Sequence, residues 1–186
     1  MCALLPLLAF LILFEHSAAA SKYGGPCCPI GWILYNADNS STQPKCAKAV
    51  KDWNTNFAQS EKACDLLGGR LISVHTAEQN KMIYDMITSM SFSKPNYVWI
   101  GLTKSSTSDE NQNSTKWYWS DGSTTKYTNW LKGYPVGRDS HNNCAIMYTK
   151  AGQFESKFGE WRDVHCDSMT APYVCEKLAC VCGRVC

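Results

Sequence analysis

Cysteine is the residue type through which this sequence is most able to do chemistry, because the chain has 11 cysteines among 186 residues. Cysteine can act as a nucleophile, bind a metal ion or form disulfides, and the redox compartment largely decides which. Histidine is scarce, with four residues. The sequence contains neither the G-x-S-x-G nor the H-E-x-x-H pattern of hydrolases. The cysteines therefore indicate disulfides in an oxidising compartment and metal sites in a reducing one.

The first twenty residues indicate the oxidising compartment. Residues 3–14 are an apolar run of 12, shorter than the about 20 residues that span a bilayer, and the small residues at 18–20 follow it. This pattern predicts a signal peptide at 1–20, secretion of the remaining chain and no membrane anchor. A buried N-terminal helix is the alternative. Cleavage would remove Cys2 and leave ten cysteines, an even number that suits a disulfide framework.

Composition excludes several classes of protein. Hydrophobic residues make up 45% of the chain and aromatic residues 12%, which excludes a disordered or fibrous protein. The formal net charge is +2 and no dense basic block occurs, so no nucleic-acid partner is expected. Two N-x-S/T triplets, which begin at Asn39 and Asn113, predict surface glycosylation.

Two helices are expected to support any site. Asn56 with Gln59, and Thr76 with Gln79, have the spacing of a capping box, so a helix should begin at each pair. The first helix should end at the glycines 68–69, where a left-handed residue is easily placed. In the second, apolar residues recur at helical spacing and form a core-facing stripe: Met82, Ile83, Met86, Ile87 and Met90.

The rest of the chain is read as short strands around one long polar stretch. β-Branched and aromatic runs predict strands at 30–35, 71–74, 97–102, 144–148, 159–161 and 173–176. Residues 103–143 lack periodicity apart from 116–119, and they are rich in Ser, Thr, Asn, Asp and Gly. A stretch of this length in a compact domain usually forms a binding loop. The fold class is therefore α+β.

Five motifs, in this order, resemble those of the long form of the C-type lectin-like domain. They are the opening Cys28-Pro29-Ile30-Gly31-Trp32, the helix from Phe57 to Cys64, the Trp99-Ile100-Gly101-Leu102 motif, the lead into the long loop formed by residues 117–122 and 127–130, and the closing Trp161-Arg162-Asp163 with Cys166 and Cys175. The resemblance implies two helices, small antiparallel sheets and a long loop held by disulfides. It divides the chain into a lead at 21–27, the domain at 28–177 and a cysteine-rich tail at 178–186.

The resemblance also implies the disulfides Cys64–Cys175, Cys144–Cys166 and Cys28–Cys46. Four cysteines remain after these pairs: Cys27, Cys180, Cys182 and Cys186. Chain ends lie close together in this family, so Cys27 can pair with a tail cysteine. The tail can instead bridge two chains into a disulfide-linked dimer. A zinc site is the third alternative, although no histidine accompanies the tail.

Sugar-binding members of the family hold a calcium ion in the long loop, and the resemblance transfers its ligand positions to 134–136, Asn142 and 161–163. Calcium prefers 6–8 oxygen ligands. Here only Asn142 and Asp163 are weak candidates for metal ligands, while Arg162 brings a positive charge that repels a cation. We therefore expect no cofactor and no calcium at this position, or only weak binding. The resemblance also suggests a cis peptide bond before Pro135.

The favoured function is a secreted recognition module that binds a carbohydrate or a protein ligand without calcium. Its candidate ligand-binding residues are Tyr134, Asn142, Asn143, Arg162 and Asp163, with Tyr134 or Trp130 stacking on a sugar ring. One hypothesis joins Arg162 and Asp163 in an ion-pair network that replaces the metal; the alternative is that these residues are merely solvated. A disulfide-linked structural or interaction subunit is the second function. A hydrolase that uses His141 or His165 with Asp163 is the third, and an enzyme is not expected.

Overall fold

The computed structural model describes residues 24–35, 43–90, 96–104, 116–124, 126–136, 141–150, 159–167 and 170–182. The expected signal peptide and the glycosylation triplets at Asn39 and Asn113 lie outside these ranges. No helix in the described ranges is long and apolar enough to cross a bilayer.

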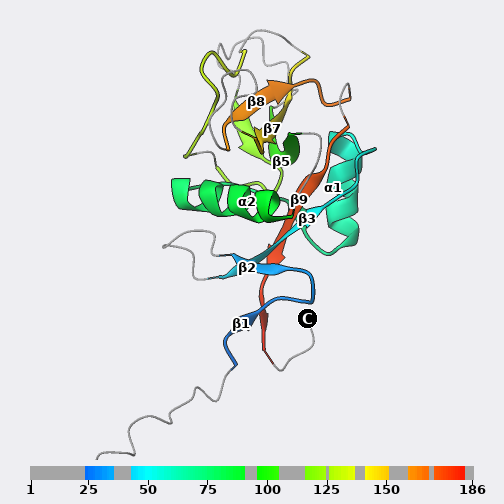
Figure 1. Ribbon diagram of the computed structural model, residues 1–186, viewed down its shortest axis with the longest axis vertical. Helices are drawn as coiled ribbons and strands as arrows, with labels where there is room; N and C mark the ends of the chain where they lie inside the picture. Colours follow the sequence, from blue (N-terminus) through cyan, green and yellow to red (C-terminus); the bar gives the residue numbers. More distant parts are fainter. Residues whose placement is uncertain are drawn as a thin grey trace, which may run out of the picture.

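The described strands form one large sheet and one small sheet (Figure 1). The path through the large sheet is β2 (Ile33–Tyr35), β3 (Lys45–Val50), β9 (Tyr173–Leu178), β5 (Tyr97–Lys104), β7 (Cys144–Tyr148) and β8 (Trp161–Val164). Off this path, β4 (Arg70–Leu71) pairs with β9, and β6 (Trp117–Trp119) pairs with β5. The pairs are antiparallel, except that β5 and β9 are parallel. The small sheet joins β1 (Pro26–Cys27) to β10 (Cys180–Val181).

Helix α1 (Phe57–Leu66) begins and ends as its sequence predicts. The Asn56 side chain accepts a hydrogen bond from the backbone N–H of Gln59, and the Gln59 side chain accepts one from that of Asn56. At the other end, Gly68 has φ +75°, and the N–H groups of Gly68 and Gly69 donate to the carbonyls of Asp65 and Cys64. These contacts are the Schellman motif, which satisfies carbonyls that would otherwise lack partners.

Helix α2 (Ala77–Ser89) confirms the predicted start but not the complete capping box. The Thr76 side chain accepts a hydrogen bond from the N–H of Gln79, as expected. The Gln79 side chain, however, accepts from the N–H of His75 rather than from that of Thr76. The apolar stripe faces the core as predicted: Ile83, Met86 and Ile87 are buried, while Met82 and Met90 are half-buried against the core.

Several strands differ in length from their predicted runs. The strand predicted at 30–35 is confined to β2, because the chain turns just before it, where the N–H of Trp32 donates to the carbonyl of Pro29. In the run 71–74, only Leu71 belongs to β4. The strand expected at 159–161 starts two residues later and continues to Val164 as β8.

The three disulfides implied by the resemblance are present: Cys28–Cys46, Cys64–Cys175 and Cys144–Cys166. The second joins α1 to β9 across 111 positions. The third joins Cys144, the first residue of β7, to Cys166, which lies just after β8. The core between the helices and the sheet contains three fully buried tryptophans, Trp99, Trp119 and Trp161. Strand β8 lies towards one end of the molecule, and the small β1–β10 sheet lies at the other (Figure 1).

Candidate functional site

Residues 126–136, one of the described parts of the long loop, are hydrogen-bonded to strand β8 and the residues just before it. The N–H of Trp161 donates to the carbonyl of Asn129, and the N–H of Leu131 donates back to the carbonyl of Trp161. The Asn129 side chain donates to the carbonyl of Gly159 at 2.8 Å. A turn follows, in which the N–H of Tyr134 donates a hydrogen bond to the carbonyl of Leu131. The Tyr134–Pro135 peptide bond is cis. These backbone contacts hold residues 129–134 along the edge strand.

Asp163 attaches the loop to β8 at one more residue, Val136. Its side chain is 1% exposed, and its two carboxylate oxygens lie 3.1 and 3.0 Å from the backbone nitrogen of Val136. Trp161 and Asp163, both in β8, contact residues 129–136, Trp161 through its backbone and Asp163 through its side chain. The retained carboxylate therefore holds the loop through a charge-assisted hydrogen bond from the protein's own backbone.

Arg162 lies between these two residues in β8 and makes different contacts. Its guanidinium lies 5.1 Å from the centre of the Tyr134 ring, a cation–π distance. A hydrogen bond with Tyr148 raises the pKa of Arg162, and the attraction of Tyr134 and Asp163 adds to this effect. Arg162 therefore remains a cation in the position where the resemblance would place a calcium ligand.

The two asparagines of the predicted site come from the segment before β7. The carbonyl of Asn143 accepts hydrogen bonds from the N–H of Lys104 and from the Thr103 hydroxyl, so β5 holds this residue. Cys144 follows at once and is bonded to Cys166, beyond β8. Asn142 and Asn143 are both partly exposed. In the described ranges, no group of three or more His, Cys, Asp or Glu side chains is arranged to hold a metal ion.

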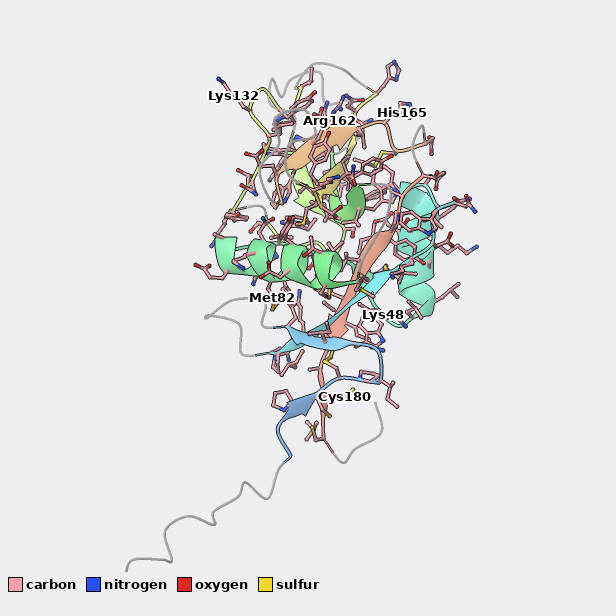
Figure 2. All side chains as sticks on the ribbon, in the orientation of Figure 1. Lys48, Met82, Lys132, Arg162, His165 and Cys180 are labelled. Carbon is pink, nitrogen blue, oxygen red and sulfur yellow. A yellow bond between two sulfur atoms is a disulfide. The ribbon has the colours of Figure 1, made fainter. Side chains whose placement is uncertain are left out.

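These residues define one candidate surface, which we call the loop surface: Tyr134, Val136, Asn142, Asn143 and Arg162. Asp163 lies beneath it and supports it. Figure 2 shows Arg162, with Lys132 and His165, at the end of the molecule opposite Cys180. Tyr134 and Arg162 are partly exposed, and Val136 is 46% exposed. Trp130 packs against Trp117 and Trp161, with ring centres 4.9 and 5.8 Å away, and is partly exposed like Tyr134.

The two histidines of the hydrolase alternative, His141 and His165, lie beside each other. The rings of His141 and His165 have centres 5.9 Å apart, and Nδ1 of His165 accepts a hydrogen bond from the N–H of Asp167. A serine–histidine contact does occur elsewhere, between Ser123 Oγ and His75 Nε2 at 3.1 Å. The Ser123 hydroxyl donates its hydrogen bond to Asp121 rather than to His75. The three residues therefore lack the nucleophile–base–orienter order of a catalytic triad.

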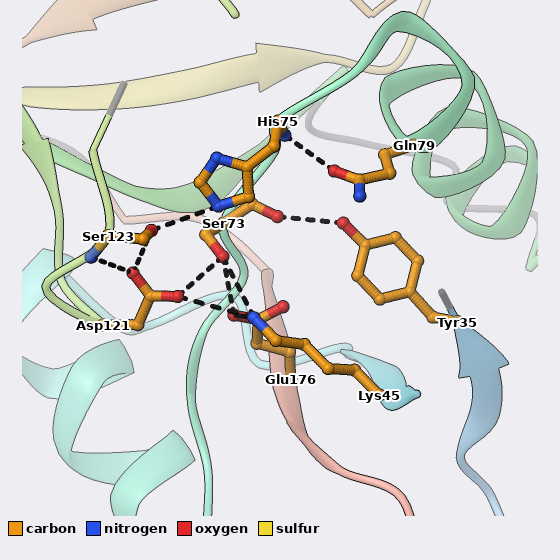
Figure 3. A network of polar contacts seen from close by, with 8 residues as sticks. All are labelled: Tyr35, Lys45, Ser73, His75, Gln79, Asp121, Ser123 and Glu176. Carbon is orange, nitrogen blue, oxygen red and sulfur yellow. Dashed lines mark hydrogen bonds and ion pairs between the residues drawn. The ribbon is translucent and has the colours of Figure 1, made fainter. Parts of the chain in front are cut away.

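A second polar cluster, the Glu176 network, lies beneath the turn at 120–123 (Figure 3). Lys45 Nζ lies 2.9 Å from Glu176 Oε1 and 3.5 Å from Asp121 Oδ2. Ser73 Oγ lies 2.7 Å from the same Glu176 oxygen and 2.8 Å from the same Asp121 oxygen. The network therefore ties β3, β9, the segment before α2 and the turn after β6 together. Lys45, Asp121 and Glu176 also line a pocket of about 770 Å³ beside the end of α1.

In both acids of this network, burial raises the pKa, while hydrogen bonds and the charge of Lys45 lower it. Burial raises the pKa of Glu176 to about 7, and the attraction of Lys45 and the Ser73 hydrogen bond offset only part of the effect. For Asp121 burial also opposes ionisation, but hydrogen bonds from Ser123 and Ser73 outweigh it and lower the pKa to about 2. Lys45 is partly buried, yet the carboxylates of Glu176 and Asp121 raise its pKa.

Burial explains why Glu176 tends to keep a proton, and the Ser73 hydroxyl offsets only part of this effect. A hydroxyl carries one proton, so Ser73 cannot donate to both carboxylates at once. Its single donor is therefore shared between Asp121 Oδ2 and Glu176 Oε1.

Inspection of the sequence missed the Glu176 network. Its members are separated by up to 131 positions, and no local spacing connects them. One signal was available, because Glu176 follows Tyr173-Val174-Cys175 in a run that reads as a strand, and a carboxylate in such a run needs a partner. The identity of that partner, Lys45, follows only from the pairing of β3 with β9.

Comparison with known proteins identifies the family. The family model of the lectin C-type domain matches residues 53–177. A perlucin-like protein of Mytilus galloprovincialis is 28% identical over 167 residues, which cover 89% of this chain and 93% of that protein. The human low affinity immunoglobulin epsilon Fc receptor is 30% identical over 155 residues, 82% of this chain but only 39% of the receptor.

A solved structure gives the same result. The C-type carbohydrate-recognition domain of cow CD23, determined in the presence of a GlcNAc2Man3 oligosaccharide, superposes with a TM-score of 0.62 at 26% identity. The match covers 84% of this chain and 99% of that domain. The described residues have the α+β fold of such domains, with two helices, antiparallel strand pairs and the expected disulfides. This chain therefore belongs to the C-type lectin domain family.

Proposed function

We propose that the protein is a secreted recognition module whose loop surface binds a carbohydrate without calcium. One observation carries the proposal: the buried Asp163 carboxylate is already bonded to the backbone of Val136. Asp163 occupies one of the positions that supply calcium ligands in sugar-binding relatives. In this chain the same carboxylate fastens the loop directly, so the loop keeps its shape without a metal bridge.

The oxygen donors around Asp163 do not suit calcium. Calcium prefers 6–8 oxygen ligands, several of them carboxylates. Val136 offers no side-chain oxygen and Asn142 offers an amide, while Arg162 adds a cation. Two like charges about 4 Å apart repel by roughly 1 kcal/mol in water and by more near a protein surface. This donor set supports recognition by the protein's own side chains.

The chemistry of the loop surface suits a sugar. The partly exposed Tyr134 ring can lie against the apolar face of a sugar ring, and Arg162 at 5.1 Å fixes the orientation of that ring. The side-chain amide groups of Asn142 and Asn143 can donate to and accept from hydroxyl groups. The oligosaccharide named for the cow relative, at 26% identity, supports carbohydrate as the class of ligand.

A protein ligand is the second candidate, and two observations favour it. Val136 exposes 46% of its surface beside Tyr134 and Arg162, and tyrosine and arginine commonly dominate the energetics of protein interfaces. The name of the human relative refers to an immunoglobulin Fc ligand. A disulfide-linked subunit is the remaining alternative. We propose no enzymatic activity, because the matching family model is that of a lectin domain and the described residues near Asp163 do not form a catalytic arrangement.

A glycan array probed in calcium and again in chelator tests this function. We expect binding to a subset of glycans that is equal in the two conditions. Tyr134→Ala should weaken this binding about tenfold, since one stacking contact contributes roughly 1–1.5 kcal/mol. The matched control is Tyr118→Ala, which removes an exposed tyrosine on β6, outside the loop surface.

Three results would distinguish the alternatives. Binding that requires calcium would contradict the proposal, and so would full binding by Tyr134→Ala. No glycan binding, together with a protein ligand that loses affinity for Tyr134→Ala, would favour the second candidate.

A further inference from the structure

Two free thiols meet where the two ends of the described chain come together. Cys27 ends β1, and Cys182 directly follows β10. The strands pair antiparallel with Cys27 opposite Cys180, and the N–H of Cys182 donates to the carbonyl of Gly25 at 3.0 Å. Alternate residues of a strand share a face, so Cys180 and Cys182 project to the same side as Cys27. The side chains of Cys27 and Cys182 are in hydrogen-bond contact.

The backbone around these thiols is fitted closely. A Cβ atom placed on Gly24 would lie 2.3 Å from the carbonyl oxygen of Cys182, a distance that no side chain tolerates. A Cβ atom on the neighbouring Gly25 would have nothing within 4 Å. The absence of a side chain at Gly24 is therefore what lets the two chain ends approach. Cys180 is disulfide-bonded, so Cys182 is the tail thiol available to Cys27.

We propose that Cys27 and Cys182 close a disulfide that clasps the two ends of the chain, and that reductant opens this bond before the other described disulfides. The two thiols lose two protons and two electrons to a disulfide oxidant such as glutathione disulfide, which becomes two glutathione thiols. The reaction passes through a mixed disulfide on one cysteine, which the other cysteine then attacks.

Closure needs only a small movement. Diagonal neighbours on paired antiparallel strands lie about 7–8 Å apart at Cα, slightly beyond the roughly 4.4–6.8 Å of disulfides. Strands β1 and β10 have two residues each, so this approach disturbs little other structure. The hydrogen bond from Cys182 raises the pKa of the Cys27 thiol, so less of it is thiolate and its attack on the oxidant is slowed.

Exposure separates this bond from Cys28–Cys46, Cys64–Cys175 and Cys144–Cys166. Cys46, Cys64 and Cys175 are 0% exposed and Cys144 is 1% exposed, so each of these three disulfides has at least one buried cysteine. Cys182 is exposed and Cys27 is partly exposed. Exposed disulfides are the ones that reductants reach first. Once Cys182 is bonded to Cys27, it can no longer form a disulfide with a second chain.

Peptide mapping of the unreduced full-length protein, treated with glutathione disulfide, tests the proposal. We expect a peptide that links Cys27 to Cys182. In a titration with dithiothreitol followed by alkylation, both residues should be labelled at a reductant concentration about tenfold below that which opens Cys64–Cys175. Glutathione disulfide should then close the bond again.

Two glycine variants make the test specific to the fitted backbone. Gly24→Ala should slow reclosure at least several-fold, while Gly25→Ala should reclose at the rate of the unmodified protein. Cys27 linked to any other cysteine, a dimer on a non-reducing gel that disappears in Cys182→Ser, or thiols that stay free after oxidation would each overturn the proposal. Glycan binding is measured separately, so failure here leaves the proposed function standing.

Discussion

Replacing Lys45 with methionine is expected to destabilise the protein by about 3 kcal/mol near pH 9 and by less than about 1 kcal/mol near pH 5. Methionine keeps the length of the side chain but removes the cation that lies 2.9 Å from Glu176. Glu176 is 3% exposed, so without Lys45 its ionised form would be a buried charge with no counter-ion. Urea unfolding at several pH values measures the difference.

The pH dependence follows from the direction of the Glu176 pKa. In the folded protein it is raised from 4.5 to about 7, so between these values the unfolded state binds fewer protons. The contribution of Glu176 is therefore complete below about pH 4.5 and is lost as pH rises towards 7. Removing Lys45 should raise this pKa further, and the loss then continues at up to about 1.4 kcal/mol per pH unit.

Two controls isolate the ion pair. Lys62→Met removes one lysine from the exposed face of α1 and should leave the pH dependence unchanged. The double variant Lys45→Met with Glu176→Gln removes the titrating acid as well, so its destabilisation should not grow with pH. A Lys45→Met variant whose destabilisation is the same near pH 5 and pH 9 would show that Lys45 does not support the charge of Glu176.

Asp163→Ala is expected to cost about 1.5–3 kcal/mol of stability and to abolish ligand binding by the loop surface. The substitution removes a charge-assisted hydrogen bond and leaves the Val136 N–H without its acceptor. Hydrogen exchange gives the most local measurement, because the Val136 amide should lose its protection while the Leu131 amide, bonded to Trp161, keeps it.

Asp163→Asn separates the hydrogen bond from the charge. Its amide oxygen can still accept from the Val136 N–H, so most of the stability and the ligand binding should remain, at a cost of about 1 kcal/mol for the weaker bond. If Asp163→Ala kept full protection at Val136, the loop would be held by other contacts and the role given to Asp163 would be wrong.

Local patterns in the sequence predicted the parts of the fold that depend on local contacts. The Asn56–Gln59 capping box and the left-handed Gly68 describe α1 correctly, because each residue bonds within one helical turn. The apolar stripe of α2 faces the core for the same reason. The disulfides came instead from the family resemblance, since spacing alone does not select one pairing.

The candidate site was only partly predictable. The resemblance indicated Asp163 and Tyr134, but it did not indicate that Asp163 would bond to Val136, 27 positions away. One hypothesis joins Arg162 and Asp163 in an ion-pair network. In the structure Arg162 lies against the Tyr134 ring and hydrogen-bonds with Tyr148, and the attraction of Asp163 adds to the raised pKa of Arg162. Neighbouring residues of a strand project to opposite faces, and this alternation directs Arg162 and Asp163 to different partners.

The loop surface is proposed to keep its shape through Asp163, Arg162 and the Cys144–Cys166 disulfide rather than through calcium. Thermal unfolding in millimolar calcium and in chelator tests this claim most directly, with magnesium as the control for non-specific ion effects. A ligand at 100 times its dissociation constant stabilises a protein by about 2.7 kcal/mol, or about 5–11 °C in Tm for a domain of this size. We predict Tm values that agree within about 1 °C in all three conditions. A rise of several degrees in calcium alone would contradict the account.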